Sequence, residues 1–150
     1  MESSQGFQRP NAFERVFNRV FGAFVGLGLG LRHNYLLQVR GRKSGKVYSA
    51  PIDLLEIDNK KYLVCPRGRS QWVRNAEASG RVTLKKGISK QDYRVVAVAN
   101  EGKPQLLKAY LDSFKTTVQR YFPVPAGSAA EAFAAVANQY PVFELATIRE

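Results

Sequence analysis

Hydrophobic positions change their spacing along this chain of 150 residues, and the changes predict different elements. Between residues 11 and 24 the apolar side chains fall at steps of three and four, which is the spacing of an amphipathic helix. They are Phe13, Val16, Phe17, Val20, Phe21 and Phe24. Asn11 is placed to cap this helix, and the polar residues 1–10 before it predict a loose N-terminal arm.

The aromatic stripe of this predicted helix fits two surfaces. It would cover a protein core, which is the commoner case, or rest on a membrane as a peripheral contact. The apolar segment that follows, residues 22–31, is interrupted by glycines and is shorter than the about 20 residues that span a bilayer. Its Gly26-Leu27-Gly28-Leu29-Gly30 run resembles part of a dinucleotide fingerprint. Because the run follows a helix instead of a strand, we expect no dinucleotide site there.

After residue 31 the pattern becomes that of short strands joined by tight turns. Strands are predicted over residues 35–40, 46–57, 61–65, 81–86, 91–99 and 140–148. Helices are predicted over 71–79, ended by Gly80, over 103–121, and from a cap at Ser128 to residue 138. Short consecutive strands predict an antiparallel meander that curls into a barrel, an α+β fold with flanking helices. The length favours one domain, residues 11–150.

The net charge of +11 comes from 23 basic and 12 acidic side chains and indicates an anionic partner. Nucleic acid, an anionic membrane and a polyanionic small molecule are the candidates. The basic residues are spread over many segments without any nucleic-acid-binding motif, so we expect no nucleic acid. One histidine and one cysteine cannot supply four zinc ligands, so no metal is expected. Cys65 has no partner for an internal disulfide, which fits a reducing cytoplasm.

Two turns concentrate the cations. The first is Gly41-Arg42-Lys43-Ser44-Gly45, the GRKSG turn, and the second is Pro66-Arg67-Gly68-Arg69-Ser70, the arginine loop. Glycines allow a close backbone approach, and the basic and hydroxyl side chains add donors, so such turns suit a phosphate. The arginine loop also leads into a predicted helix, whose N-terminus attracts anions. Beside it, Trp72 either stacks on a planar ligand or anchors the core.

Acid and base groups are scarce. His33 is the only histidine and precedes the first strand, where a boundary histidine is commoner than a catalytic one. No serine lies in a nucleophile elbow. Asp53, Glu56 and Asp58 lie on one hairpin arm, and we expect the Asp53 side chain to face outward. The sequence therefore predicts a protein that binds a reactive cofactor and leaves the chemistry to it.

Three stretches together resemble the deazaflavin-dependent nitroreductase family. They are LLQVRGRKSGKVYSAP over residues 36–51, KYLVCPRG over 61–68, and the Trp-x-x-Asn of Trp72 and Asn75. The resemblance covers residues 11–148. It implies a split β-barrel related to flavin-binding and pyridoxamine-phosphate-oxidase-like proteins, often a homodimer. It also implies coenzyme F-420, a deazaflavin with a phosphodiester and a poly-glutamate tail, which gives hydride to quinones, nitro compounds or other conjugated acceptors.

The resemblance also implies roles for individual residues. Phosphate contacts fall on the first turn, ring and tail contacts on the arginine loop, and ring contacts on the helix after it and on a strand proline. The phosphate contacts are Arg42, Lys43, Ser44 and Lys46, and the ring and tail contacts are Arg67 and Gly68. The ring contacts are Trp72 and Asn75 on the helix and Pro51 on the strand. Tyr48 stands where well-studied members have a basic residue, so FMN is an alternative cofactor.

The expected acceptor is apolar and planar, covered by a lid over residues 122–133. A tyrosine is expected to donate a proton or hydrogen bond to it, with Tyr48, Tyr121 and Tyr140 as the candidates. The alternative function is a barrel that holds a flavin, a fatty acid or another ligand without turnover.

Overall fold

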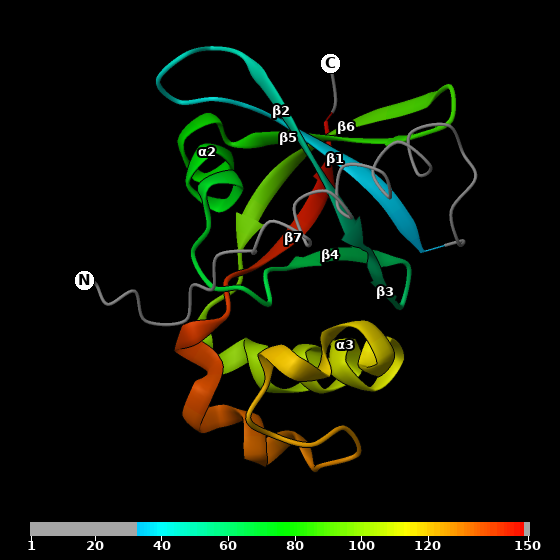
Figure 1. The fold of residues 1–150 in the computed structure, drawn as a ribbon, viewed down its shortest axis with the longest axis vertical. Helices are drawn as coiled ribbons and strands as arrows, with labels where there is room; N and C mark the ends of the chain where they lie inside the picture. Colours follow the sequence, from blue (N-terminus) through cyan, green and yellow to red (C-terminus); the bar gives the residue numbers. More distant parts are fainter. Residues whose placement is uncertain (1–32, 149–150) are drawn as a thin grey trace.

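The computed structural model describes residues 33–148, so the predicted arm and the helix predicted over 11–24 lie outside the described residues. Figure 1 shows a curled sheet with one helix against its side and a helical layer beneath it. Within the described range no helix is both long enough and apolar enough to cross a bilayer.

Seven strands form one sheet, and each neighbouring pair is antiparallel. They are β1 (Asn34–Arg40), β2 (Val47–Asp53), β3 (Leu55–Ile57), β4 (Lys60–Val64), β5 (Arg81–Lys86), β6 (Ser89–Ala97) and β7 (Val142–Thr147). The spatial order is β2-β1-β5-β6-β7-β4-β3. The antiparallel prediction is confirmed, but the simple meander is wrong. β1 pairs with β5 and β4 pairs with β7, because the chain leaves the sheet through helices between these strands.

The strand predicted over 46–57 is two strands, separated at Leu54. The Leu54 side chain is buried, and its backbone N–H donates to the His33 carbonyl at 2.8 Å, in register with the Asn34–Asp53 pair that ends β2. β2 and β3 follow one another in the chain yet lie at the two ends of the strand order. The sheet must therefore curl, which gives the half-barrel that the sequence predicted.

The helices are α2 (Gln71–Ser79), η1 (Asn100–Gly102), α3 (Lys103–Val118), η2 (Gln119–Tyr121) and η3 (Ala130–Gln139). The prediction for α2 is confirmed, including its end at Gly80, which has the left-handed φ of 76°. The helix predicted over 103–121 changes to 3-10 geometry after Val118. The helix predicted from Ser128 is the 3-10 helix η3, preceded by Ala129, so the Ser128 cap is wrong.

Two hydrophobic cores hold these layers. One fills the inside of the curled sheet against α2, with Leu37, Leu63 and Val73 fully buried. The other lies between α3, η3 and the β4 side of the sheet. Phe122 and Phe133 belong to this second core, with 6% and 0% of their surface exposed. The predicted lid over 122–133 is therefore wrong, because its aromatic rings pack inward.

Candidate cofactor-binding site

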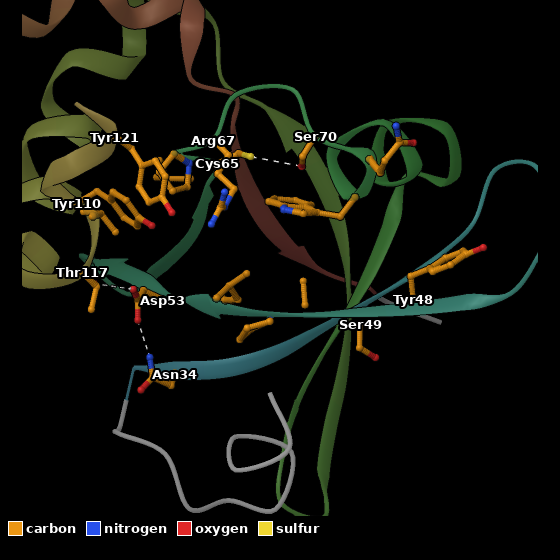
Figure 2. A pocket seen from close by; sticks show the side chains of 18 of the residues that line it. Asn34, Tyr48, Ser49, Asp53, Cys65, Arg67, Ser70, Tyr110, Thr117 and Tyr121 are labelled. Carbon is orange, nitrogen blue, oxygen red and sulfur yellow. Dashed lines mark hydrogen bonds between the residues drawn. The ribbon is translucent and has the colours of Figure 1, made fainter. Parts of the chain in front are cut away.

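A cavity of about 1390 Å³ lies between β2, the arginine loop, α2 and the C-terminal end of α3 (Figure 2). Both cationic segments reach it. Of the cofactor-binding residues predicted from the sequence, the cavity brings together Arg42, Lys43, Ser44, Pro51, Arg67, Trp72 and Asn75. Lys46 and Gly68 do not line it. Of the three predicted tyrosines, Tyr48 and Tyr121 line it and Tyr140 does not.

The GRKSG turn is closed by its own backbone. The N–H of Gly41 donates to the Lys46 carbonyl at 2.7 Å, and the N–H of Gly45 donates to the Gly41 carbonyl at 3.0 Å. Gly45 has a φ of 77°, where a side chain would be strained. A Cβ on Gly41 would lie 2.6 Å from the Tyr48 ring and 2.9 Å from Ser44 Oγ. The turn is therefore compact, and its cationic residues Arg42 and Lys43 are exposed and line the cavity.

Asn75 ties this turn to α2. Its Oδ1 accepts hydrogen bonds from the Arg42 backbone N–H at 3.1 Å and from Arg42 Nη1 at 2.7 Å, and its side chain is almost fully buried. The resemblance placed Asn75 beside the cofactor ring. The structure gives its carbonyl oxygen a different task, which is to fix the turn that carries Arg42 and Lys43.

The arginine loop is built around the Cys65 thiol. Cys65 Sγ donates to the Gly68 carbonyl at 2.6 Å, and Gly68 has a φ of 86°. Burial raises the pKa of Cys65, so the sulfur stays a protonated thiol and acts as a structural donor. Gly68 itself is buried. Its role in this structure is to shape the loop that presents Arg67.

Tyr121 orients the cations at the α3 side. The guanidinium carbons of Arg67 and Arg120 lie 4.9 Å and 4.8 Å from the centre of its ring, within cation–π range. Its hydroxyl accepts a hydrogen bond from Arg120 Nη2 at 2.6 Å. Figure 2 shows Arg67 and Tyr121 side by side at the cavity wall. Tyr121 therefore joins η2 to the arginine loop.

Trp72 was expected either to stack on a planar ligand or to anchor the core, and its position combines features of both. The indole is half-buried and its ring centre lies 6.4 Å from that of Phe143, in the core under the sheet. It also lines the cavity next to Asn75 and Gln71. Trp72 therefore combines an anchored edge with an accessible one, as a stacking residue needs.

The remaining tyrosines differ in access. Tyr48 is 49% exposed, and its hydroxyl lies 3.2 Å from Ser44 Oγ at the GRKSG end. Tyr140 is buried in the second core, where its hydroxyl donates to the Tyr121 carbonyl at 2.5 Å. Burial raises the pKa of Tyr140. Tyr140 does not line the cavity, so its buried hydroxyl is not placed to donate a proton to a molecule bound there.

The far end of the cavity holds residues that sequence reasoning missed. Asp53 was expected to face outward, but its side chain is only 15% exposed and lines the cavity with His33 and Tyr110. Burial raises the pKa of Tyr110 well above its usual range, and the Asp53 charge adds to the rise. The hairpin register could have revealed the position of Asp53, because pairing Arg40 with Val47 across the turn brings Asn34 opposite Asp53.

The described part of the chain contains no group of three His, Cys, Asp or Glu side chains that could hold a metal ion. Apart from Asp53, His33 and the Cys65 thiol, the polar groups of the cavity are cations, hydroxyls and amides, and Ala50, Pro51 and Ile52 add apolar lining. Such a set suits an organic anion with an apolar ring system.

Residues 13–124 match the family described as F420H(2)-dependent quinone reductase. The chain belongs to this family. Membership confirms the predicted family and, with it, a deazaflavin-dependent reductase that uses coenzyme F-420. The FMN alternative gains no support. No curated protein matches the chain.

Solved structures similar to this family member share its fold at low sequence identity. An F-420-dependent reductase is 20% identical, with 76% of this chain and 94% of that chain covered and a TM-score of 0.51. An FAD-binding protein of Mesorhizobium loti is 14% identical, with coverages of 87% and 89% and a TM-score of 0.50. A third structure, described as a domain-swapped dimer, is 20% identical, with coverages of 89% and 92% and a TM-score of 0.55. These likenesses confirm the split β-barrel.

Proposed function

We propose that this family member holds reduced F-420 in the cavity and uses it to reduce an apolar, planar, conjugated acceptor such as a quinone or a nitro compound. The observation that carries the proposal is the meeting of two cationic segments at one cavity. Lys43 lies on the turn between β1 and β2, Arg67 lies after β4, and Trp72 lines the same cavity.

The residues present fit the anionic part of this cofactor. Arg42, Lys43 and Ser44 offer charged and hydroxyl donors, and hydrogen bonds between a cation and a phosphate are stronger than neutral ones. Asn75 pre-positions Arg42, and Tyr121 pre-positions Arg67. Because these donors are held before a ligand arrives, less binding energy is lost in ordering them.

The ring would lie along the apolar lining, between Pro51 and the indole of Trp72. When bound, the reduced deazaflavin supplies the hydride. The protein supplies binding, orientation and the exclusion of water around the two reacting molecules. The volume of about 1390 Å³ exceeds the roughly 300–1000 Å³ of a typical single-ligand pocket, so there is room for an acceptor beside the cofactor.

A binding and turnover experiment tests this function. Reduced F-420 and FMN are titrated in parallel into the full chain, and cofactor oxidation is then followed after adding a quinone or a nitroaromatic compound. We expect tighter binding of F-420 and turnover that needs both protein and acceptor. Binding without turnover would favour the non-catalytic ligand carrier, and no binding of F-420 would contradict the proposal.

The quaternary structure is a second part of the proposal. The similar structure described as a domain-swapped dimer supports a homodimer for this chain. Sedimentation of the full chain over a range of concentrations tests this, because a stable dimer keeps its mass on dilution. The peripheral membrane contact predicted for residues 11–24 stays a prediction, which flotation with anionic vesicles would test.

A further inference from the structure

We propose that His33, oriented by Asp53, donates the proton that the acceptor takes up when it receives hydride. This inference rests on the proposed function. It concerns the end of the cavity away from the GRKSG turn. β2 runs from Val47 beside that turn to Asp53, and seven residues of strand span roughly 20 Å at about 3.3 Å each. The cationic end and the histidine end are therefore separated by about the length of the strand.

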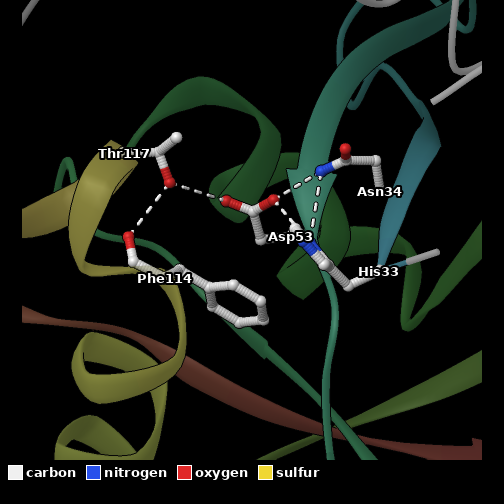
Figure 3. Close-up of polar contacts among 5 residues, drawn as sticks. All are labelled: His33, Asn34, Asp53, Phe114 and Thr117. Atoms are coloured by element: carbon white, nitrogen blue, oxygen red, sulfur yellow. Dashed lines mark hydrogen bonds and ion pairs between the residues drawn. The ribbon is translucent and has the colours of Figure 1, made fainter. Parts of the chain in front are cut away.

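The His33–Asp53 contact fixes which ring nitrogen carries a proton. His33 Nδ1 lies 3.1 Å from Asp53 Oδ1 (Figure 3). An ionised carboxylate only accepts hydrogen bonds, so Nδ1 is the donor in this contact. Asn34 Nδ2 also lies 3.4 Å from Nδ1, but with Nδ1 protonated this longer contact joins two donors and is not a hydrogen bond. Among the described residues no hydrogen bond occupies Nε2. In the protonated ring, Nε2–H is therefore the donor left for a molecule in the cavity, which His33 lines.

Asp53 is itself held from two sides. Asn34 Nδ2, on the opposite strand, donates to Asp53 Oδ1 at 2.5 Å, and the Thr117 hydroxyl of α3 approaches Oδ2 at 3.4 Å. The His33 ring packs against Phe114, with 4.6 Å between the ring centres. Figure 3 shows this cluster drawing β1, β2 and α3 together. Asp53 is thus a positioning residue for the imidazole.

Other groups near the cavity are poorer proton donors. The pKa of Tyr110 is raised well above its usual range, and burial also raises the pKa of Cys65. The Tyr121 hydroxyl is engaged by Arg120, and Tyr48 lies at the GRKSG end. Histidine is the side chain whose ordinary pKa lies between pH 5 and 8. His33 is 37% exposed, so solvent can return a proton to it after each turnover.

The step balances for a quinone acceptor. The hydride carries two electrons and one hydrogen nucleus from the reduced cofactor, which becomes oxidised, to the acceptor, which becomes reduced. The Nε2–H bond of His33 breaks as an O–H bond forms on a quinone oxygen. The hydride hydrogen and the His33 proton are together the two hydrogens that the hydroquinone gains, so the second oxygen takes up no net proton from solvent. Water then reprotonates Nε2.

Other titratable and charged groups share the cavity with His33 and must be considered in any pH profile. They are Asp53 on β2, Tyr110 and Lys115 on α3, Cys65 and Arg67 after β4, Arg120 and Tyr121 in η2, and the more distant Arg42, Lys43 and Tyr48. Because several of them titrate, a pH profile alone cannot assign the donor. The test therefore needs a direct observation of His33.

The chain makes that observation straightforward, because its single histidine gives unambiguous imidazole NMR signals. We expect neutral His33 to carry its proton on Nδ1 in the wild-type protein and to lose this preference in Asp53→Asn. We also expect kcat for quinone reduction to fall with rising pH, with the midpoint at which the His33 signal titrates. Different midpoints would overturn the inference, whatever the fate of any variant.

Substitution gives the second arm. His33→Gln should lower kcat by about 100-fold or more, the usual range for general acid catalysis, and change the Kd of F-420 less than about twofold. Lys90→Ala, on an exposed strand remote from the cavity, is the control for kcat. An unchanged kcat in His33→Gln, with the wild type active, overturns this inference alone. A wild type that reduces no acceptor overturns the proposed function and this inference with it.

Discussion

At the scale of single residues, the site depends on side chains whose partners are distant in the sequence. Asn75 accepts two hydrogen bonds from Arg42, and Asp53 receives His33 and Asn34. Each of these contacts joins two elements of the fold. Arg42, which would meet the cofactor, is thus held by the neutral Asn75, which adds no charge of its own.

Removing the Asn75 amide should weaken cofactor binding although Asn75 itself need not touch the cofactor. In Asn75→Ala the GRKSG turn loses its attachment to α2, and a hydrogen bond to a charged group contributes about 1.5–3 kcal/mol. We expect the Kd of F-420 to rise about 10-fold or more in a fluorescence titration. Asn138→Ala, an exposed asparagine on η3, is the matched control. Equal Kd values for the two variants would contradict the role given to Asn75.

The residues of the GRKSG turn could be found from the sequence because their conformations are local. Gly45 needs a positive φ, and glycine in a turn signals it. The His33–Asp53 contact could not be found in the same way. It joins residues 20 positions apart and requires the exact hairpin register, which the sequence implies only once the turn is known to pair Arg40 with Val47.

At the scale of elements, the break between β2 and β3 and the packing of the segment 122–133 differ from prediction because both depend on tertiary packing. No glycine or proline stands at Leu54, and the prolines after Phe122 do not reveal which way the aromatic rings point. Leu54 stands within an apolar run, so the pattern predicts a strand that continues through it. Phe122 and Phe133 flank prolines and resemble a mobile lid in sequence, but their rings meet edge to face at 6.2 Å inside the second core.

The core position of Phe133 predicts a loss of stability. Phe133→Ala should lower the free energy of unfolding by about 3–5 kcal/mol, the usual cost of removing a buried aromatic ring. Denaturant unfolding measures this. Val124→Ala, a partly buried neighbour on the same connection, should cost clearly less. If Phe133→Ala kept full stability and changed only the KM for the acceptor, the segment would be a lid after all.

The contact between α3 and the loop before η3 predicts a pH dependence. The Gly127 backbone N–H donates to Asp112 Oδ1 at 2.8 Å and Lys108 Nζ donates to Oδ2 at 3.0 Å, and these bonds lower the pKa of Asp112. A lowered folded-state pKa stabilises the protein above the ordinary aspartate range, and the gain is lost as pH falls through the lowered pKa.

The variant Asp112→Asn isolates this effect. The wild type should be the more stable of the two near neutral pH, and the difference should shrink as the solution is acidified. Asp92→Asn, on an exposed strand, is a comparison for general charge effects. Thermal unfolding at several pH values checks the prediction. A difference that grows on acidification would contradict the assigned direction of the shift.

At the scale of the whole molecule, the cavity lies where the helical layer, α2 and the curled sheet meet. The sequence predicts the family and the fold class because the GRKSG turn, the arginine loop and the strand pattern are local features. It does not predict that the end of α3 forms one wall, since that depends on how two separate cores stack. Only folding brings some of the basic residues behind the net charge of +11 together at one cavity.

The central claim is that Lys43 and Arg67, on separate elements, hold one anionic cofactor. The most direct test is the Kd of reduced F-420 at one ionic strength for the wild type, Lys43→Ala, Arg67→Ala and Lys90→Ala. We predict that the first two substitutions each raise the Kd about 10- to 100-fold, since each removes a charge-assisted contact of about 1.5–3 kcal/mol. Lys90→Ala should stay within about twofold of the wild type. Equal losses in all three variants would mean that diffuse charge attracts the cofactor, and would contradict the account.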